Sequence, residues 1–537
     1  MKRKVMRSLL LALCCGACGI ASAGEETMRA KFDRQFDQAM QRYGLPGLAV
    51  GVVRDGEVVY LRTAGEKTLG SGEAIGADTL FKIASNGKSM TAAALARLAD
   101  AGKLDWNDPV KKHLPAFRMH DPWVEREFRI RDLLIHNSGL PLGAGDLMQW
   151  PEPNDFTRAD ILAGLAHLKP STSFRSEYAY DNLMYVVAGE VGAAVSGVPV
   201  ETLVQREVFE PLGMKRCVID AFERDAVGDI ATPHRRMDGK YVALDADPPQ
   251  VPKTVYAAAG GIRCSVRDMT TWIANWLDPE RTPGWLSKEQ RKAAFTGWMP
   301  IPIGARQAAW DGSHFHAYGH GWRLSDTHGV FRAAHTGTLD GMLSAVTLLP
   351  DKRIGYVLLM NSDVDDARSA LNQALLMQFI ADDAAGYDVD DYAAKLDAAR
   401  LASDVAEIRR AAAQRDPLPL SQVPDRFVGI YVDPWFGEIA LCPRDGALRW
   451  RSRRSPSLDG VVKQVSGRWL VEWDERGFNA DVWLDMVEGA APAGNVAPHD
   501  GGQTAGSPTM RLSAVDPDTD FSYDFHDLSP QWIRACD

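Results

Sequence analysis

The chain has 537 residues, of which 45% are hydrophobic and 24% charged, with a formal net charge of -11 at pH 7. This composition excludes fibrous and largely disordered proteins, and the length exceeds what one hydrophobic core usually supports. The acidic balance disfavours nucleic acid and anionic membrane surfaces as partners. We therefore expect a globular protein of two domains, or of one large and one small domain, with no nucleic-acid partner.

The first 23 residues have the features of an export signal. A basic start is followed by a short apolar run and the small residues Ala21-Ser22-Ala23. The run is shorter than the ~20 apolar residues of a membrane span. Three cysteines, Cys14, Cys15 and Cys18, leave a lipoprotein signal open as an alternative, although none follows the usual leucine and small residues. We expect cleavage after Ala23, no transmembrane anchor afterwards, and a periplasmic or secreted protein.

Four cysteines remain after this cleavage, and they are widely spaced: Cys217, Cys264, Cys442 and Cys536. They form no CxxC pair, and the chain has no HExxH motif. A zinc site is therefore not expected, whereas a disulfide is compatible with the sequence, which does not assign its pairing.

The predicted elements begin with an amphipathic helix over residues 28–43. Two alternating apolar runs, "GLAVGVVRD" and "GEVVYLRTAG", then predict a hairpin that turns at Asp55-Gly56. The segment "SMTAAALARLADAGKL" predicts a buried helix with Gly102 as its stop signal. From about 104 to 260, helical patterns alternate with loops rich in proline and glycine.

Strand signals return at "GVFRAAHTG", "MLSAVTLLP" and "RIGYVLLMNS", followed by a helix from about Asp366 to Ile380. This order predicts a sheet built from both ends of the domain, with helices packed over it. We place the first domain at 24–385 and a linker helix at 386–423. Short strand patterns at regular spacing predict a small antiparallel barrel or sandwich over 424–537.

The stretch "KIASNGKSMTA" places Ser85 three residues before Lys88 as the pattern turns helical. Positions three apart share a helix face, so the amine could take the proton of the serine hydroxyl. This requires a substantially buried lysine, because burial lowers its pKa. The alternative is a helix-capping serine and a solvated lysine, and the pair alone is a weak signal.

The stretch "YAYDNLMYVVAG" holds Tyr180 and Asn182. A tyrosine between a loop and a helix could sit over the serine and relay protons, while the asparagine amide could hold both the lysine and a substrate carbonyl. The alternative for Tyr180 is a packed ring with its hydroxyl at the surface.

The third motif is His335-Thr336-Gly337, which ends one predicted strand. A glycine there allows a substrate backbone to approach the strand edge. We expect the backbone N–H groups of Thr338 and Ser85 to bind an oxyanion.

In this order the three motifs resemble the serine β-lactamase and penicillin-binding superfamily, specifically its class C-like branch of β-lactamases, D-Ala-D-Ala carboxypeptidases, D-aminopeptidases and related esterases. The stretches "IRDLLIHNSGLP", "AAGGIRCSVRDMTTW" and "YGHGWRLS" are similar to landmarks of this family. The resemblance covers roughly residues 30–382. The tail from about 424 resembles the small β-barrel domain appended to many such hydrolases.

The resemblance implies an α/β (α+β) fold: an antiparallel sheet flanked by helices, beside a mostly helical subdomain, with the site in the cleft between them. It implies that Ser85 is the acylated nucleophile, Lys88 its base partner, and Tyr180 the acid and base near the leaving group. Asn182 and the strand at His335, Thr336 and Gly337 would bind substrate. No metal or organic cofactor is implied.

One position departs from the class C β-lactamases, which carry lysine where this chain has His335. A histidine of ordinary pKa is mostly neutral at pH 7, so efficient penicillin hydrolysis is not expected, and turnover should titrate between pH 5 and 8 through His335. We expect an exported hydrolase of amides or peptides that contain D-amino acids, including cell-wall peptides. The alternatives are a carboxylesterase, a weak β-lactamase, or a non-catalytic peptidoglycan-binding or sensor protein. No Gly-x-Ser-x-Gly occurs, which argues against an α/β-hydrolase site.

Overall fold

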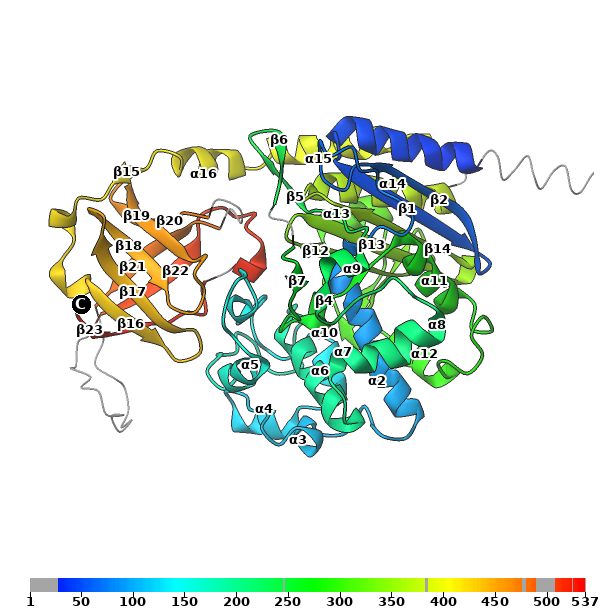
Figure 1. Cartoon of the computed structure of the whole chain (residues 1–537), viewed down its shortest axis with the longest axis horizontal. Helices are drawn as coiled ribbons and strands as arrows, with labels where there is room; N and C mark the ends of the chain where they lie inside the picture. The colour runs from blue at the N-terminus through cyan, green and yellow to red at the C-terminus, as the bar shows by residue number, and fades with distance from the viewer. Residues whose placement is uncertain are drawn as a thin grey trace, which may run out of the picture.

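The computed structural model describes residues 28–244, 247–381, 385–475, 480–488, 508–523 and 525–536. The expected signal peptide and its alternatives therefore lie outside the described residues. Figure 1 shows a larger domain that holds the N-terminal two thirds of the chain, and beside it a barrel, drawn in yellow to red.

The centre of the larger domain is an eight-stranded sheet in which every neighbouring pair is antiparallel. The predicted hairpin at Asp55-Gly56 and the three predicted later strands are confirmed, and three further strands extend the sheet. In spatial order the strands are β2 (Glu57–Gly65), β1 (Gly47–Arg54), β14 (Ile354–Met360), β13 (Met342–Leu349), β12 (Val330–Leu339), β11 (Arg323–Thr327), β10 (His316–Tyr318) and β9 (Met299–Pro300).

Helices bury both faces of this sheet. Successive side chains of a strand point to opposite faces, and in β1 Leu48 and Val50 belong to one apolar core while Ala49 and Val53 belong to the other. The first core includes the predicted helix over 28–43, together with α14 (Asp365–Ile380) and α15 (Val389–Leu401). The second includes α11 (Val266–Leu277) and α2 (Gly87–Asp100).

The middle of the chain forms the mostly helical part of this domain, as predicted. Small strands also occur there, including a hairpin that the sequence did not predict. The helices are α3 (Val110–His113), α4 (Pro122–Glu127), α5 (Arg158–Gly164), α6 (Leu183–Ser196), α7 (Val200–Val204), α8 (Glu210–Leu212), α9 (Arg224–Val227), α10 (Ala257–Gly260), α12 (Lys288–Ala294) and α13 (Ala305–Asp311); the small strands are β3 (Phe81–Lys82), β4 (Phe222–Glu223), β5 (His234–Met237), β6 (Lys240–Ala243), β7 (Gln250–Val251) and β8 (Arg263–Cys264).

The segment predicted as one linker helix forms two, α15 and α16 (Val405–Ala411). The first of them packs against α14 through Tyr392 and Leu396, so it belongs to the core of the larger domain. Figure 1 shows α16 running between the larger domain and the barrel.

The C-terminal region is a closed antiparallel barrel, which confirms the predicted fold class. Each barrel strand pairs with its neighbours in space, and pairing of β19 (Asp459–Val465) with β20 (Arg468–Trp473) closes the barrel. A short strand, β15 (Asp416–Pro417), also pairs with β19, at Lys463 and Gln464. The barrel strands are β16 (Gly429–Asp433), β17 (Gly437–Arg444), β18 (Ala447–Ser452), β19 (Asp459–Val465), β20 (Arg468–Trp473), β21 (Val482–Val487), β22 (Thr509–Ala514) and β23 (Gln531–Arg534).

The four cysteines outside the N-terminal segment form two disulfides, Cys217–Cys264 in the larger domain and Cys442–Cys536 in the barrel. In the parts of the chain described above, no single helix is long and apolar enough to cross a membrane. A bent pair, Leu183–Ser196 with Val200–Leu212, meets that criterion only when taken together.

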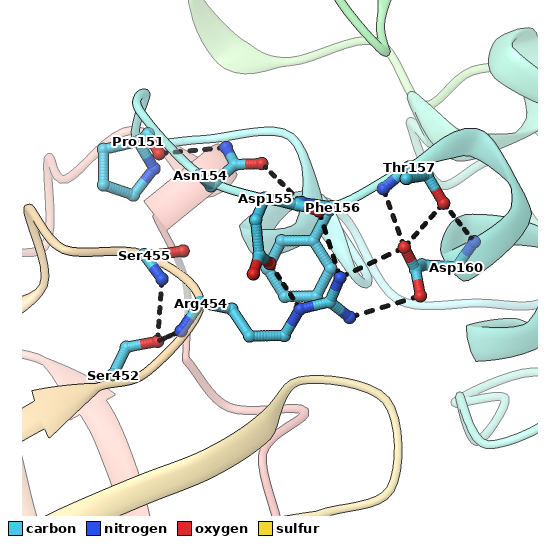
Figure 2. A network of polar contacts seen from close by, with 9 residues as sticks. All are labelled: Pro151, Asn154, Asp155, Phe156, Thr157, Asp160, Ser452, Arg454 and Ser455. Atoms are coloured by element: carbon cyan, nitrogen blue, oxygen red, sulfur yellow. Dashed lines mark hydrogen bonds and ion pairs between the residues drawn. The ribbon is translucent and has the colours of Figure 1, made fainter.

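The barrel is held against the larger domain by Arg454, which follows β18. Figure 2 shows its guanidinium between Asp155 and Asp160, at 2.6 Å from Asp155 Oδ1 and 3.1 Å from Asp160 Oδ2. The same group lies 4.0 Å from the ring centre of Phe156. A planar cation with several donors suits such a contact, because it binds carboxylates and an aromatic face together.

Candidate active site

The Ser85 hydroxyl lies in a short 3-10 turn, Ala84–Asn86, directly before α2. Ala84 has a φ of +49°, a left-handed conformation that is uncommon for alanine and is seen where the surrounding structure holds the chain. Ser344 of β13 provides such a hold, since its hydroxyl donates to Ile83 O and accepts from Asn86 Nδ2, each at 2.7 Å. The sheet thus fixes the turn that presents Ser85.

Lys88 is fully buried one helical turn after Ser85, as the sequence argument requires. Its Nζ lies 3.0 Å from Ser85 Oγ and 2.7 Å from both Asn182 Oδ1 and Ala259 O. Burial lowers the pKa of Lys88 to about 7, opposed by Asp146 and assisted by Arg323. A neutral amine has two N–H bonds and one lone pair. The two carbonyl oxygens accept the N–H bonds, which leaves the lone pair for the serine proton.

Asn182, the residue before α6, links Lys88 to a buried carboxyl group. Its Nδ2 donates to Asp146 Oδ2 at 2.7 Å, and the other oxygen of Asp146 accepts from Gln149 Nε2 at 2.7 Å. With both of its oxygens accepting N–H groups, Asp146 orients the Asn182 amide so that Oδ1 faces the lysine. Asp146 begins a short 3-10 helix, Asp146–Met148, and no sequence motif marks it as part of the site.

The ring of Tyr180 lies beside Lys88, whose Nζ is 4.9 Å from the ring centre. His136 stacks on the other side of this tyrosine, with ring centres 4.2 Å apart. Burial raises the pKa of the Tyr180 phenol well above its usual value, opposed by Arg323 and by a hydrogen bond with Ser85. The surface alternative for Tyr180 is wrong, because the residue is buried against the serine and lysine.

The third motif lies on a stretch of β12 that has only one strand beside it. Pairing with β11 ends at Ala334, whereas pairing with β13 continues from Ala333 to Leu339. The surroundings of Gly337 explain why the motif contains a glycine. A Cβ at this position would lie 2.2 Å from Ile83 O and 3.0 Å from Ala84 Cβ. The strand can therefore approach the serine turn only with glycine at this position.

His335 differs from the sequence expectation in its chemistry. It is buried, its Nε2 lies 2.7 Å from Tyr318 Oη, and its Nδ1 lies 2.7 Å from Thr336 O. Burial lowers the pKa of His335 well below its usual value, and Arg323 and Lys88 lower it further. This argues against the expected titration of His335 between pH 5 and 8, because burial, Arg323 and Lys88 all favour the neutral imidazole.

Arg323, at the start of β11, supplies a permanent positive charge beside the third motif, where the class C β-lactamases carry a lysine and this chain carries His335. Its guanidinium lies 5.3 Å from the ring centre of Tyr180, and its Nη1 lies 3.5 Å from Thr336 Oγ1. Within the described part of the chain, no carboxylate forms an ion pair with it. Arg323 is part of the family landmark "YGHGWRLS". It pairs across the strands with Ala334, the residue before the His335-Thr336-Gly337 motif.

The site opens into a cavity of about 880 Å³ between the two domains. The larger domain contributes Ser85, Tyr180, Asn182, Arg323, Thr336 and Thr338 to its lining. The barrel side contributes residues 518–523, which lie between β22 and β23. The ring of Phe521 meets that of Tyr180 edge-on, with centres 5.7 Å apart. No motif in the sequence of residues 518–523 marks them as part of a site.

The residues expected from the sequence thus meet at one place: Ser85, Lys88, Tyr180, Asn182 and the strand at 335–338. Across the described ranges, no group of three or more histidine, cysteine, aspartate or glutamate side chains is arranged to hold a metal ion.

Comparison with known proteins identifies the family. The family model Beta-lactamase matches residues 32–378, which is more than half of the chain. The chain belongs to the beta-lactamase family.

Two curated relatives and one solved structure are similar to this member of the beta-lactamase family. "Unguisins hydrolase ungD" of Aspergillus violaceofuscus is 26% identical over 377 residues, which are 67% of this chain and 65% of the relative. "Protein flp" of Staphylococcus aureus is 26% identical over 344 residues, 62% of each chain. The chain therefore spans less than two thirds of the length of these relatives. The octameric penicillin-binding protein homologue from Pyrococcus abyssi matches with a TM-score of 0.55 and 20% identity, over 86% of this chain and 97% of that chain, which shows a shared fold.

Proposed function

We propose that the protein is an exported peptidase of the class C-like branch, which forms an acyl-enzyme on Ser85 and releases a D-amino acid with a free carboxylate. The observation that carries this proposal is Arg323. Arg323 is half-buried and has no carboxylate partner among the described residues, so a substrate carboxylate would find an unpaired cation there. Arg323 lies beside Thr336, where a carboxylate could accept hydrogen bonds from both side chains.

In the proposed acylation step, neutral Lys88 takes the proton of Ser85 while Oγ attacks the substrate carbonyl carbon. Negative charge then develops on the carbonyl oxygen, and the backbone N–H groups of Ser85 and Thr338 would stabilise it. The C–N bond breaks as Tyr180 donates its proton to the leaving amine. The raised pKa of this phenol supports the assignment, because it keeps the proton on Tyr180 until the amine requires it.

The proton of Lys88 then returns the tyrosine to its phenol form. Water attacks the acyl-enzyme with one of these groups as its base, and releases the acid and free Ser85. This order restores every group to its starting state.

Export is supported by the two disulfides, because such bonds persist mainly in oxidising compartments. An exported enzyme that recognises a D-amino acid with a free carboxylate would meet its substrates among cell-wall peptides. The name of the relative ungD, a hydrolase of unguisins, agrees with a hydrolytic activity.

A D-aminopeptidase is the second candidate, favoured by acidic groups at the other end of the same strand. Asp340 follows β12 and lines the cavity, as does Asp520 from the barrel side. Both carboxyl groups lie at the cavity wall, where a substrate ammonium could bind.

The deciding experiment compares N-acetyl-D-Ala-D-Ala, its C-terminal amide and its L,L isomer as substrates of wild type, Ser85→Ala and Arg323→Gln. We expect cleavage of the acid to exceed that of the amide by about tenfold to a hundredfold, since one charge-assisted contact is lost in the amide. Ser85→Ala should abolish cleavage, and Arg323→Gln should remove the preference for the acid.

Equal rates on acid and amide, or on the two stereoisomers, would contradict the peptidase proposal. Faster cleavage of the free D-Ala-D-Ala amine than of its N-acetyl form would favour the aminopeptidase. Cleavage of p-nitrophenyl esters alone would indicate a carboxylesterase, and cleavage of nitrocefin alone a β-lactamase. Failure of a fluorescent phosphonate to label Ser85 would indicate a non-catalytic binding or sensor protein.

A further inference from the structure

A second cavity of about 340 Å³ adjoins the catalytic one, and nothing above uses it. It lies between β12, α13 and α14. Arg323 and Thr336 line both cavities. The two cavities therefore meet at the pair of side chains that we assign to the substrate carboxylate.

Strand geometry shows how the cavities are arranged. Side chains alternate along β12, so Arg332, Ala334 and Thr336 share one face with Thr338. The first three line the second cavity, and the last two line the catalytic cavity. At about 3.3 Å per residue, the second cavity extends roughly 13 Å along the strand from Thr336 to Arg332. A leaving group held at Thr336 would point its far end into this space.

The second cavity is rich in cations. Four arginines line it, against two carboxylates: Arg306, Arg323, Arg332 and Arg368, with Asp311 and Asp365. Arg332 pairs with Asp311 at 3.2 Å, and Arg368 pairs with Asp365. Neither Arg306 nor Arg323 forms an ion pair with any residue that the structure describes.

Two further observations indicate an excess of positive charge there. Arg332 Nε is buried and has no hydrogen-bond partner among the described residues. His316 also lines the cavity, and burial together with Arg323 and Arg332 lowers its pKa to about 4. An anion in the cavity would meet unpaired donors and a neutral imidazole, and no competing free carboxylate.

We propose that this second cavity is a subsite for an anionic group on the leaving part of the substrate, so that the preferred leaving group carries two carboxylates. The first binds Arg323 and Thr336, and the second extends toward Arg306 and Arg332. This inference rests on the proposed peptidase function and specifies its leaving group, a D-amino acid with an acidic side chain.

Binding without turnover provides the test. Ser85→Ala is titrated by calorimetry with N-acetyl-D-Ala-D-Glu and with N-acetyl-D-Ala-D-Gln, which differ only in the distal charge. We expect the glutamate compound to bind about tenfold more tightly, because it gains one charge-assisted contact. N-acetyl-D-Ala-D-2-aminoadipate, one methylene longer, tests how far the carboxylate must reach.

A second variant tests the role of Arg306 in this binding. Arg306 is exposed on α13 and can be replaced with little risk to folding. In Ser85→Ala/Arg306→Gln the preference for glutamate over glutamine should shrink to less than about threefold. Ser85→Ala/Arg34→Gln, altered at an exposed arginine of the N-terminal helix, should keep it. Equal affinities in Ser85→Ala, or no binding of either compound at millimolar concentration, would overturn the proposal.

Turnover by wild type separates this inference from the function on which it rests. Cleavage of both compounds at equal efficiency would leave the peptidase proposal intact and remove the subsite. A preference for glutamate in binding without Ser85-dependent cleavage would retain the anion subsite and remove the peptidase.

Discussion

The amine of Lys88 lies 3.0 Å from the hydroxyl of Ser85, and carbonyl oxygens occupy its two other hydrogen-bonding directions. With a pKa of about 7, this amine loses its proton within the physiological range. The protonated form cannot accept the serine proton, so the acylation rate should fall about tenfold per pH unit below pH 7 and level off above it. Stopped-flow acylation by a phosphonate between pH 5 and 9 measures this profile.

Two variants test which group is responsible for the pH dependence of the acylation rate. Lys88→Met should lower the acylation rate by about a thousandfold, the range of a lost general base, while Lys103→Met, at an exposed position, should leave it unchanged. His335→Gln should retain the midpoint near pH 7, because His335 is already neutral there. A midpoint that disappears with His335→Gln would return the titration to the histidine.

Asp146 should set the pKa of Lys88 from behind Asn182. In its ionised form Asp146 raises the pKa of the lysine, against the larger effect of burial, while burial also raises the pKa of Asp146 itself well above its usual value. Asp146→Asn should therefore move the midpoint of the acylation profile to lower pH, and lower the plateau rate about tenfold because the Asn182 amide loses a charged acceptor. Asp225→Asn, at an exposed carboxylate, is the control. An unchanged midpoint would show that Asp146 acts only as a packing group.

Phe521 should restrict the size of the acyl group. Its ring covers Tyr180 from the barrel side of the cavity. We expect Phe521→Ala to raise KM for N-acetyl-D-Ala-D-Ala several-fold with kcat nearly unchanged, and to improve the relative kcat/KM of a substrate with a longer acyl chain. Ile533→Ala, on the exposed surface of β23, should change neither value. A fall in kcat alone would instead place Phe521 in the orientation of Tyr180.

Arg454 should hold the barrel in place. Arg454→Ala removes its contacts with Asp155 and Asp160, which are partly exposed, so we expect a loss of about 1 kcal/mol in the free energy of unfolding. Arg453→Ala, at the exposed neighbour, should lose less. Thermal unfolding of the three proteins measures the differences.

The pH dependence of this loss has a definite sign. Arg454 lowers the pKa of Asp160 to about 2, below its value in the unfolded chain. The contact therefore stabilises the fold fully above about pH 4, and the stabilisation disappears as the pH falls toward 2. The difference between wild type and Arg454→Ala should be constant from pH 5 to 8 and narrow below pH 4. A difference that persists at pH 2 would assign it to packing on Phe156.

The sequence predicted those parts of the site that depend on local spacing. Ser85 and Lys88 share one helical turn, and Gly337 stands in the three-residue motif His335-Thr336-Gly337, so both have a local pattern, although the close approach that requires the glycine comes from folding. Asp146 and Arg323 act across long separations in the sequence. Their partners, Asn182 and Thr336, are adjacent only after folding, and no local pattern distinguishes them from ordinary loop and strand residues.

The fold shows the same division. Alternating apolar runs predicted β1, β2, β12, β13 and β14, and helical periodicity predicted the helix over 28–43. The remaining strands of the sheet, β9 to β11, are two to five residues long, too short for alternation to be read. The pairing of the four cysteines likewise required knowledge of which strands lie together.

The connection between β22 and β23 has a consequence for how this protein can change over evolutionary time. Both of its ends are fixed in a closed barrel, and the disulfide Cys442–Cys536 joins the chain just beyond β23 to β17. Insertions, deletions and substitutions within the connection can therefore reshape one wall of the cleft while the barrel strands and Ser85, Lys88 and Tyr180 stay as they are. Selection for a new substrate can therefore act on the connection between β22 and β23, which is separate in the chain from the residues proposed to carry out the reaction.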